Sequence, residues 1–169
     1  SGVVVMPMAR WLAERYGRKT VYQVALAVFS IGLALDTLAT TSLQMVFARA
    51  IQGAASGVLA PVSLAILLDV LPPARHARIS LVWTLCILLG ISTGASIGGW
   101  FSEYHGWRSI FYFSLPMAGF IFLVMALFLP EKKAERVSRF DFFGLATFSL
   151  GMIGLQMLLN RGERLEWFP

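Results

Sequence analysis

The sequence predicts an all-α integral membrane protein, a partial helical bundle with about five complete membrane spans and the end of another. Three observations lead to this prediction. Hydrophobic residues make up 57% of the chain and charged residues only 14%, whereas about 25% of a typical soluble domain is charged. Apolar runs of membrane-spanning length recur along the chain. The lysines and arginines concentrate in the short connections between those runs.

The apolar runs predict the positions of the helices along the chain. Residues 2–9 have the character of the last turns of an earlier span, and the runs then cover 20–39, 43–68, 79–101, 109–129 and 142–159. Each run can cross a hydrocarbon core about 30 Å thick, and backbone groups find no water in lipid, so we expect helices. Pro72 and Pro73 end the second run, because proline breaks a helix. Asp141 precedes the last run, where its charge complements the helix dipole.

The connections divide into two sets that alternate along the chain. Of the 14 lysines and arginines, ten lie in residues 10–19, 70–78 and 130–141, and three lie in 102–108 and in the tail from residue 160. Positive charge in short loops marks the cytoplasmic side of a membrane protein. We therefore expect a multi-pass protein of the cytoplasmic (inner or plasma) membrane, with the first set of loops cytoplasmic. Because the basic residues flank spans, we expect no nucleic-acid partner.

Few residues are available for metal or redox chemistry. The single cysteine, Cys86, cannot form an internal disulfide or a metal cluster alone, and we expect its thiol to be buried in the surrounding apolar run. The apolar runs contain no histidine, metal-ligand cluster or pair of acids. We therefore expect no cofactor, no metal and no catalytic residues, and we do not expect an enzyme.

The stretch GISTGASIGG, residues 90–99, contains two overlapping copies of G-x-S-x-G, the pattern of a hydrolase nucleophile elbow. That motif needs a strand before the serine and a nearby histidine. Residues 90–99 instead lie inside an apolar run, and His76 and His105 lie in the connections on either side. In a helix, glycines four residues apart form one stripe, which lets another helix approach closely. The stripe consists of Gly90, Gly94 and Gly98, with Gly99 beside it.

Arg49 is the only basic residue inside an apolar run. An arginine within the bilayer costs at least a few kcal/mol unless it has a polar partner, faces a cavity or snorkels to the interface. Gln52 and Gly53 follow at i+3 and i+4 on the same helix face. Snorkelling and an inward orientation both stay open, and the polar neighbour favours the inward one. Asp36, near the outer end of its run, could be a buried acid, but we expect it to be solvated at the interface.

Residues 10–19, RWLAERYGRK, form a short connection that is rich in charge. Gly17 can take the positive φ of a tight turn between two spans. Glu14 can pair with flanking arginines or with a helix N-terminus. Simple anchoring on the cytoplasmic side would also explain the basic residues.

Four motifs occur in an order that resembles the major facilitator superfamily, in particular its fourteen-span drug:proton antiporters (the EmrB/QacA type). LAERYGRK, residues 12–19, is similar to the loop signature G-x-L-a-D-r-x-G-r-k between spans 2 and 3. RAIQG, residues 49–53, is similar to R-x-x-Q-G of span 4. GISTGASIGG resembles the span 5 exporter signature G-x-x-x-G-P-x-x-G-G, and WRSIFYFSLP, residues 107–116, resembles the opening of span 6. The short link before the last run favours fourteen spans over twelve.

The resemblance implies a domain organisation and shows four departures. Residues 1–129 would be part of the N-terminal transporter bundle, from the end of span 2 to span 6. Residues 130–141 would be a cytoplasmic linker, and 142–169 span 7 with its external exit. The departures are Arg10 for glycine and Glu14 for aspartate in the loop signature, Ala95 for proline in the exporter signature, and Ser114 where the subtype commonly has asparagine. Without that proline the span has less reason to bend.

The resemblance implies a proton-coupled multidrug efflux transporter that works by alternating access between two helix bundles. The residues implied are Arg49, Gln52 and Gly53 for proton coupling, Glu14, Arg15, Gly17, Arg18 and Lys19 for a cytoplasmic latch, and Gly90, Gly94, Gly98 and Gly99 for a dry packing surface. The proton-carrying acid is expected on span 1, outside this sequence. The implied partners are the lipid bilayer, protons, small hydrophobic or cationic substrates, and a membrane-fusion adaptor with an outer-membrane channel. The alternatives are a same-fold metabolite transporter and a non-transporting membrane binding or sensor subunit.

Overall fold

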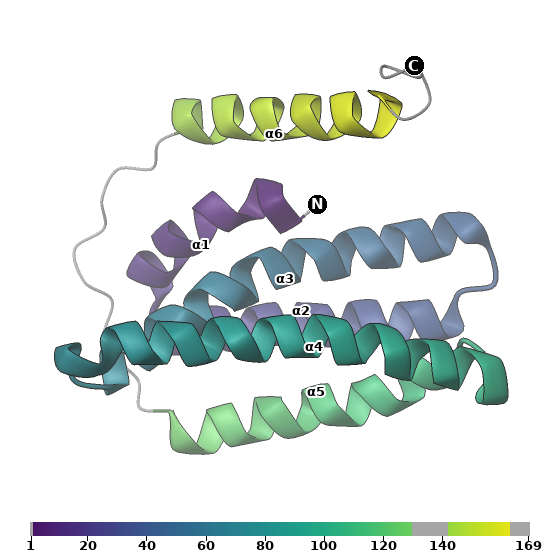
Figure 1. Cartoon of the computed structure of the whole chain (residues 1–169), viewed down its shortest axis with the longest axis horizontal. Helices are drawn as coiled ribbons and strands as arrows, with labels where there is room; N and C mark the ends of the chain where they lie inside the picture. The colour runs from purple at the N-terminus through teal and green to yellow at the C-terminus, as the bar shows by residue number, and fades with distance from the viewer. Residues whose placement is uncertain (1, 130–141, 163–169) are drawn as a thin grey trace.

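The computed structural model describes residues 2–129 and 142–162, nearly all of which are helical. The helices are α1 (Gly2–Tyr16), α2 (Arg18–Leu38), α3 (Ser42–Val70), η1 (Pro73–Arg75), α4 (His76–His105), α5 (Ser109–Phe128) and α6 (Phe142–Gly162), shown in Figure 1. Each predicted apolar run corresponds to one of the helices α2 to α6, so the predicted all-α fold is confirmed. The predicted linker at 130–141, with Asp141, and residues 163–169 of the predicted exit lie outside the described residues.

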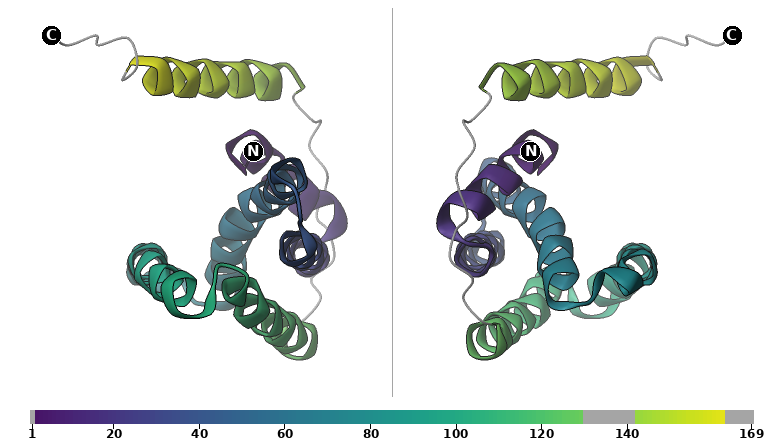
Figure 2. Two further views of the ribbon diagram at one scale, coloured as in Figure 1. Left: turned by 90° about the vertical axis from the view of Figure 1, so that its right-hand side faces the viewer. Right: turned by 90° about the vertical axis from the view of Figure 1, so that its left-hand side faces the viewer.

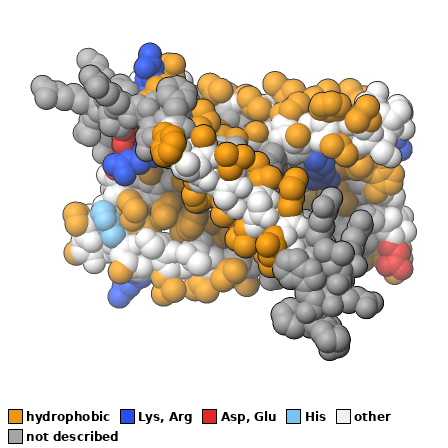
Figure 3. Space-filling view, turned by 90° about the horizontal axis from the view of Figure 1, so that it is seen from above, with side chains coloured by type: hydrophobic (Ala, Val, Ile, Leu, Met, Phe, Trp, Pro, Cys, Tyr) orange, Lys and Arg blue, Asp and Glu red, His pale blue; other side chains and the backbone are white. Residues whose placement is uncertain are grey.

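The helices have the length and surface of membrane spans. Four stretches are long and apolar enough to cross a membrane, namely α2, α3, η1 with α4, and α5. The apolar part of α6, Phe143–Leu159, is shorter and lies at the lower end of the usual range of about 17–25 residues. Figure 3 shows hydrophobic side chains along the length of one face, with most charged side chains near its two ends. Such a surface suits contact with lipid or with further helices.

The boundaries between helices follow from particular residues. Gly17, between α1 and α2, has a φ of 86°, which confirms the predicted tight turn, since that region favours glycine. Thr41 begins α3 with a capping box, in which its side chain accepts a hydrogen bond from the backbone of Gln44 and the Gln44 side chain accepts one from the backbone of Thr41. Pro72 and Pro73 end the helical path after α3, as predicted, and Pro73 starts η1.

α2 is the central element because it packs against α1, α3 and α5. In the end-on views of Figure 2, α3 runs between α2 and α4. One buried cluster joins α1, α2 and α3 and consists of Ala9, Ala13, Val21, Ala25, Val58, Val62 and Ile66. A second cluster joins α2 and α5 and consists of Leu26, Leu33, Phe111 and Ala118. The order of packing around α2 fixes which side chains can meet inside the bundle.

At Gly32, α2 and α3 leave no room for a side chain. A Cβ atom at this position would stand 2.6 Å from Cγ of Gln52 and 3.3 Å from the carbonyl oxygen of Ala48. Ala48 and Ala55 on the facing side of α3 are also small and buried. Small residues let membrane helices approach closely, so Gly32 brings the Gln52 side of α3 directly against α2.

α2 and α5 are joined at both ends. Nζ of Lys19, at the start of α2, donates a hydrogen bond to the carbonyl oxygen of Ala126 near the end of α5 over 3.0 Å. Nη2 of Arg108, at the start of α5, donates to the carbonyl oxygen of Ala39 at the end of α2 over 3.0 Å. Each cation satisfies a carbonyl at a helix C-terminus and complements its dipole. These contacts place the connections 10–19 and 102–108 at opposite ends of the bundle, in agreement with the predicted alternation.

α4 contributes least to the buried core. None of its residues is buried, and one side-chain contact to α3 runs from Nε1 of Trp83 to Oγ of Ser63 over 3.1 Å. Cys86 is exposed on this helix. The prediction of a buried thiol is therefore wrong, because the apolar run around Cys86 faces outward from the described helices.

The substitution Gly32→Ala is expected to destabilise the packing of α2 on α3 by about 1–3 kcal/mol, as overpacking usually does. The added methyl group would meet Gln52 and the α3 backbone. The measurement is thermal unfolding of the purified complete protein in detergent. Gly119→Ala on α5, where no heavy atom lies within 4 Å of the added Cβ, is the matched control. Equal stability of the two variants would contradict the close contact.

Candidate functional site: a polar triad

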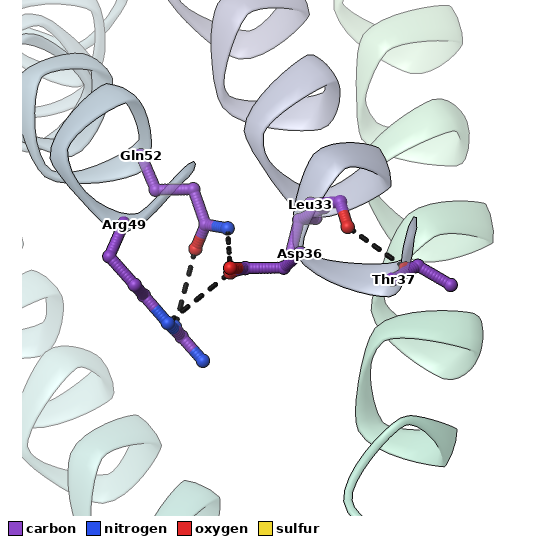
Figure 4. Close-up of polar contacts among 5 residues, drawn as sticks. All are labelled: Leu33, Asp36, Thr37, Arg49 and Gln52. Carbon is purple, nitrogen blue, oxygen red and sulfur yellow. Dashed lines mark hydrogen bonds and ion pairs between the residues drawn. The ribbon is translucent and has the colours of Figure 1, made fainter. Parts of the chain in front are cut away.

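Three polar side chains meet between α2 and α3, and we call Asp36, Arg49 and Gln52 the polar triad (Figure 4). Nε of Arg49 lies 3.2 Å from Oδ2 of Asp36. Nε2 of Gln52 donates to the same oxygen over 2.5 Å. Nη1 of Arg49 donates to Oε1 of Gln52 over 3.4 Å. Every member of the triad therefore contacts the other two.

The sequence places these residues together through helix periodicity. Arg49 and Gln52 are three residues apart on α3 and share one face. Asp36 lies four residues after Gly32, on the same face of α2. The close approach at Gly32 therefore sets the acid opposite the arginine.

Asp36 is fully buried, with a side chain 0% exposed. The prediction that it is solvated at the interface is wrong. Packing of α3 against α2 covers the carboxylate and supplies a cation and an amide donor, which compensate for its lost hydration. The contacts from Arg49 and Gln52 both reach Oδ2, whereas Oδ1 is buried and has no hydrogen-bond partner among the described residues.

The guanidinium of Arg49 contacts both Asp36 of α2 and Phe111 of α5. Its side chain remains 56% exposed, and its guanidinium carbon lies 5.1 Å from the centre of the Phe111 ring on α5. A cation within about 6 Å of a ring face is attracted to it. Arg49 therefore has partners on α2, α3 and α5, namely Asp36, Gln52 and Phe111. Its polar neighbour Gln52 favoured such contacts over snorkelling.

A cavity of about 480 Å³ adjoins the triad between α2, α3 and α5. Its walls are mainly apolar and aromatic, and the residues are Tyr22, Leu26, Phe29, Leu33, Arg49, Gln52, Leu59, Ile110, Phe111, Phe113, Ser114, Met117, Ala118 and Ile121. Asp36 does not line the cavity but bonds to both Arg49 and Gln52, which do. An apolar space with a few polar groups has the character of a small-molecule site.

Gly53, the third residue predicted for proton coupling, has a separate place. Its carbonyl oxygen accepts a hydrogen bond from Oγ of Ser56 over 3.0 Å, within α3. The structure thus brings Arg49 and Gln52 together with Asp36, and no described contact joins Gly53 to them.

A second polar group lies at the opposite end of α2. Nη1 of Arg18 lies 2.5 Å from Oδ2 of Asp69 and donates to the carbonyl oxygen of Ala65 over 2.8 Å. Lys19 donates to the end of α5. Two of the predicted latch residues therefore connect the start of α2 to the C-terminal ends of α3 and α5, where cations are favourable.

The other latch residues make contacts within α1. Oε1 of Glu14 lies 2.8 Å from Nε of Arg10, one turn earlier, which confirms the predicted pairing with a flanking arginine. This hydrogen bond and the charge of Glu14 raise the pKa of Arg10. The guanidinium carbon of Arg15 lies 5.3 Å from the Trp11 ring centre and 5.6 Å from that of Tyr16. Glu14 and Arg15 thus hold neighbouring side chains of α1 in place, just before the turn at Gly17.

The glycine stripe lies in the middle of α4. Apart from the chain neighbours and backbone of α4 itself, no heavy atom of the described residues lies within 4 Å of a Cβ built at Gly90, Gly94 or Gly99, and at Gly98 the nearest is Cδ1 of Ile110 at 3.8 Å. The dry packing surface therefore stays a prediction about a partner helix elsewhere. Because α4 is helical from His76 to His105, these residues cannot form the strand-to-helix turn of a nucleophile elbow.

The described residues offer no metal centre. Across 2–129 and 142–162, no group of three or more histidine, cysteine, aspartate or glutamate side chains is placed to hold a metal ion. The polar triad and the Arg18–Asp69 pair instead join helices to one another, and the triad also borders the cavity.

Two residues that build these groups were missed by the sequence reasoning. Asp69 lies in the last turn of α3, where an acid is unfavourable to the helix dipole and therefore needs a cation nearby. Gly32 is a lone glycine within a helix, which costs about 1 kcal/mol relative to alanine and so suggests a packing role. Both signals exist in the sequence, but neither identifies the partner element.

Proteins similar to this chain carry names that refer to multidrug export or resistance. The chain is 29% identical over 170 residues to "Multidrug export protein EmrB" of Escherichia coli (strain K12), covering 99% of this chain and 33% of that protein. It is 33% identical over 148 residues to "Multidrug resistance protein B homolog" of Mycobacterium tuberculosis (strain ATCC 25618 / H37Rv), covering 88% and 27%. It is 32% identical over 168 residues to "Multidrug resistance protein Stp" of Mycobacterium tuberculosis (strain CDC 1551 / Oshkosh), covering 98% and 31%. The chain spans about a third of the length of these relatives.

The family match covers nearly the whole chain. The family model of the Major Facilitator Superfamily matches residues 1–162. This match agrees with the apolar helices and with the order of the four sequence motifs. The protein is a multi-pass membrane protein with a helical fold, and the chain belongs to the major facilitator superfamily.

Proposed function

We propose that the complete protein is a proton-coupled efflux transporter, which exports hydrophobic, often cationic compounds across the cytoplasmic membrane in exchange for protons. The observation that carries this proposal is the polar triad beside an apolar cavity. A fixed cation and a space for an apolar molecule lie side by side within one helix bundle. The names of the relatives, which refer to multidrug export and resistance, support the same class of substrate.

Arg49 is the proposed coupling residue. Its guanidinium stays protonated at any physiological pH, so its surroundings, and not its own charge, must respond to the proton. Gln52 contacts both members of the ion pair and lines the cavity. It is therefore placed to orient Arg49 toward either the acid or the cavity.

The two ends of the bundle have separate proposed roles. We place the connections 10–19, 70–78 and 130–141 on the cytoplasmic side, because they carry most of the basic residues. The contacts of Arg18 and Lys19 with α3 and α5 support the latch that the loop signature implies. The glycine stripe of α4 is proposed to receive a helix of a fourteen-span protein and to limit leakage there.

Two alternatives concern the same fold. A metabolite transporter is less well supported, because the walls of the cavity are mainly apolar and aromatic. A binding or sensor subunit would keep the triad but would not move substrate. We propose a transporter rather than an enzyme, since the polar groups stabilise helix contacts or border the cavity. A membrane-fusion adaptor and an outer-membrane channel are proposed partners in a cell with two membranes.

The substitution Arg49→Ala is expected to abolish proton-driven efflux and to leave membrane insertion intact. It removes the cation beside the cavity, and the buried acid that remains can be protonated. The measurement is ethidium efflux from energised cells, with the amount of protein in the membrane fraction determined in parallel. Arg75→Ala removes the same charge from the exposed turn η1 and is the control that should transport normally. Unchanged efflux by Arg49→Ala would contradict the coupling role.

The substitution Gly94→Leu is expected to block transport, because a large side chain would prevent the close approach of a helix to the stripe on α4. Ser92 is also exposed on α4 but lies two residues from both Gly90 and Gly94, on the other side of the helix, so Ser92→Leu is the matched control. Both variants are compared with wild type by the same efflux assay and by membrane level. Wild-type efflux by Gly94→Leu would show that no helix packs closely there.

A further inference from the structure

The two oxygens of the Asp36 carboxylate have different surroundings. Oδ2 accepts a hydrogen bond from Gln52 and pairs with Arg49. Oδ1 is buried and has no hydrogen-bond partner among the described residues. Buried polar atoms are almost always hydrogen-bonded, so an orphaned carboxylate oxygen needs an explanation. A position that binds a proton in part of a functional cycle provides one.

A proton can bind at Oδ1 without displacing either neighbour from Oδ2. A proton from water would form an O–H bond at Oδ1, and the carboxylate would become a neutral carboxylic acid. Gln52 and Arg49 could both still donate to Oδ2, but the positive charge of Arg49 would no longer be balanced by a carboxylate. The reverse step returns the proton to water and restores the pair, so charge and atoms balance in both directions.

We infer that Asp36 binds the exchanged proton, and that its protonation makes the cavity unfavourable for a cationic substrate. This inference rests on the proposed function and deepens it, because it assigns a proton site within the residues described here. Asp36 contacts Arg49 and Gln52, which line the cavity, but does not line the cavity itself. The electrostatic potential at the cavity wall therefore depends on whether Asp36 balances the charge of Arg49.

The charges around Asp36 determine the sign of the effect. Among the described residues, Arg49 of α3 pairs with the acid, and Arg108 at the start of α5 donates to the carbonyl oxygen of Ala39, three residues further along α2 and its cap. With Asp36 ionised, the charge of Arg49 is balanced and the cavity can accept a cation. With Asp36 protonated, Arg49 presents an unbalanced positive charge, which repels a cation and leaves a neutral molecule unaffected. Proton and cation therefore exclude one another, as an exchange of one for the other requires.

The experiment measures binding of two probes to the purified complete protein over a range of pH. Tetraphenylphosphonium is the cationic probe, and Nile red is the neutral one. In wild type, the affinity for tetraphenylphosphonium should rise with pH by up to about tenfold per pH unit for each proton displaced, whereas that for Nile red should stay flat. Asp36→Asn lacks the titrating group. This variant should bind tetraphenylphosphonium weakly at every pH. The number of protons displaced by each bound cation, given by the slope of log affinity against pH, should be one lower than in wild type.

A matched control separates the carboxylate from its helix. Thr37 follows Asp36, and its hydroxyl donates to the carbonyl oxygen of Leu33 over 2.9 Å (Figure 4). Thr37→Val should therefore reproduce the wild-type slope. A wild-type slope in Asp36→Asn would overturn the inference. If Asp36→Asn fails to insert, Asp36→Glu keeps a titrating carboxyl, and its slope should persist with a displaced midpoint. An unmoved midpoint in that variant would likewise overturn the inference.

Transport distinguishes this inference from the proposed function. Wild-type protein in vesicles should export ethidium when a proton gradient is imposed. If it binds tetraphenylphosphonium in the pH-dependent manner described but exports nothing, the proposed function fails while Asp36 remains a proton site. If it exports ethidium and Asp36→Asn shows the same proton dependence as wild type, the proposed function holds and the role of Asp36 fails.

Discussion

The close packing of α2 against α3 is the constraint on which the rest of the structure depends. Lipid tails are as apolar as the helices, so close contact in a membrane requires small residues and polar partners. Gly32 is the small residue that lets the Gln52 side of α3 approach α2. One turn later, this approach brings Asp36 opposite its polar partner Arg49. Phe111 of α5 lies beside the guanidinium of Arg49. Removal of this contact would leave a charge in the bundle without its partner.

The polar triad contributes to specificity more than to stability. Burial of the Asp36 carboxylate offsets much of its attraction to Arg49, whereas loss of Arg49 would leave the buried carboxylate without its cation. The Asp36–Arg49 pair therefore rarely separates while both members are charged, but it weakens when either member loses its charge. A bundle that must exist in two arrangements can use such a pair to select between them.

Helix positions could be predicted from the sequence, whereas contacts between helices could not. Apolar run length and proline positions determine where a span begins and ends, and these features located α2 to α6. Arg49 and Gln52 could be identified because an arginine is costly in lipid and a neighbouring amide shares its face. The burial of Asp36 could not, since it depends on α3 covering α2. The same reason explains Cys86, whose apolar run faces away from the described helices.

The cations at the two ends of the α2–α5 pair have a mechanical consequence. Lys19 joins the start of α2 to the end of α5, and Arg108 joins the start of α5 to the end of α2. Two attachments at opposite ends of an antiparallel pair resist both sliding and splaying. The pair should therefore move as one rigid unit, and any bending during the proposed transport cycle should occur in other elements. None of the residues of α4 is buried. α4 is therefore the helix best able to exchange neighbours while the α2–α5 pair keeps its shape.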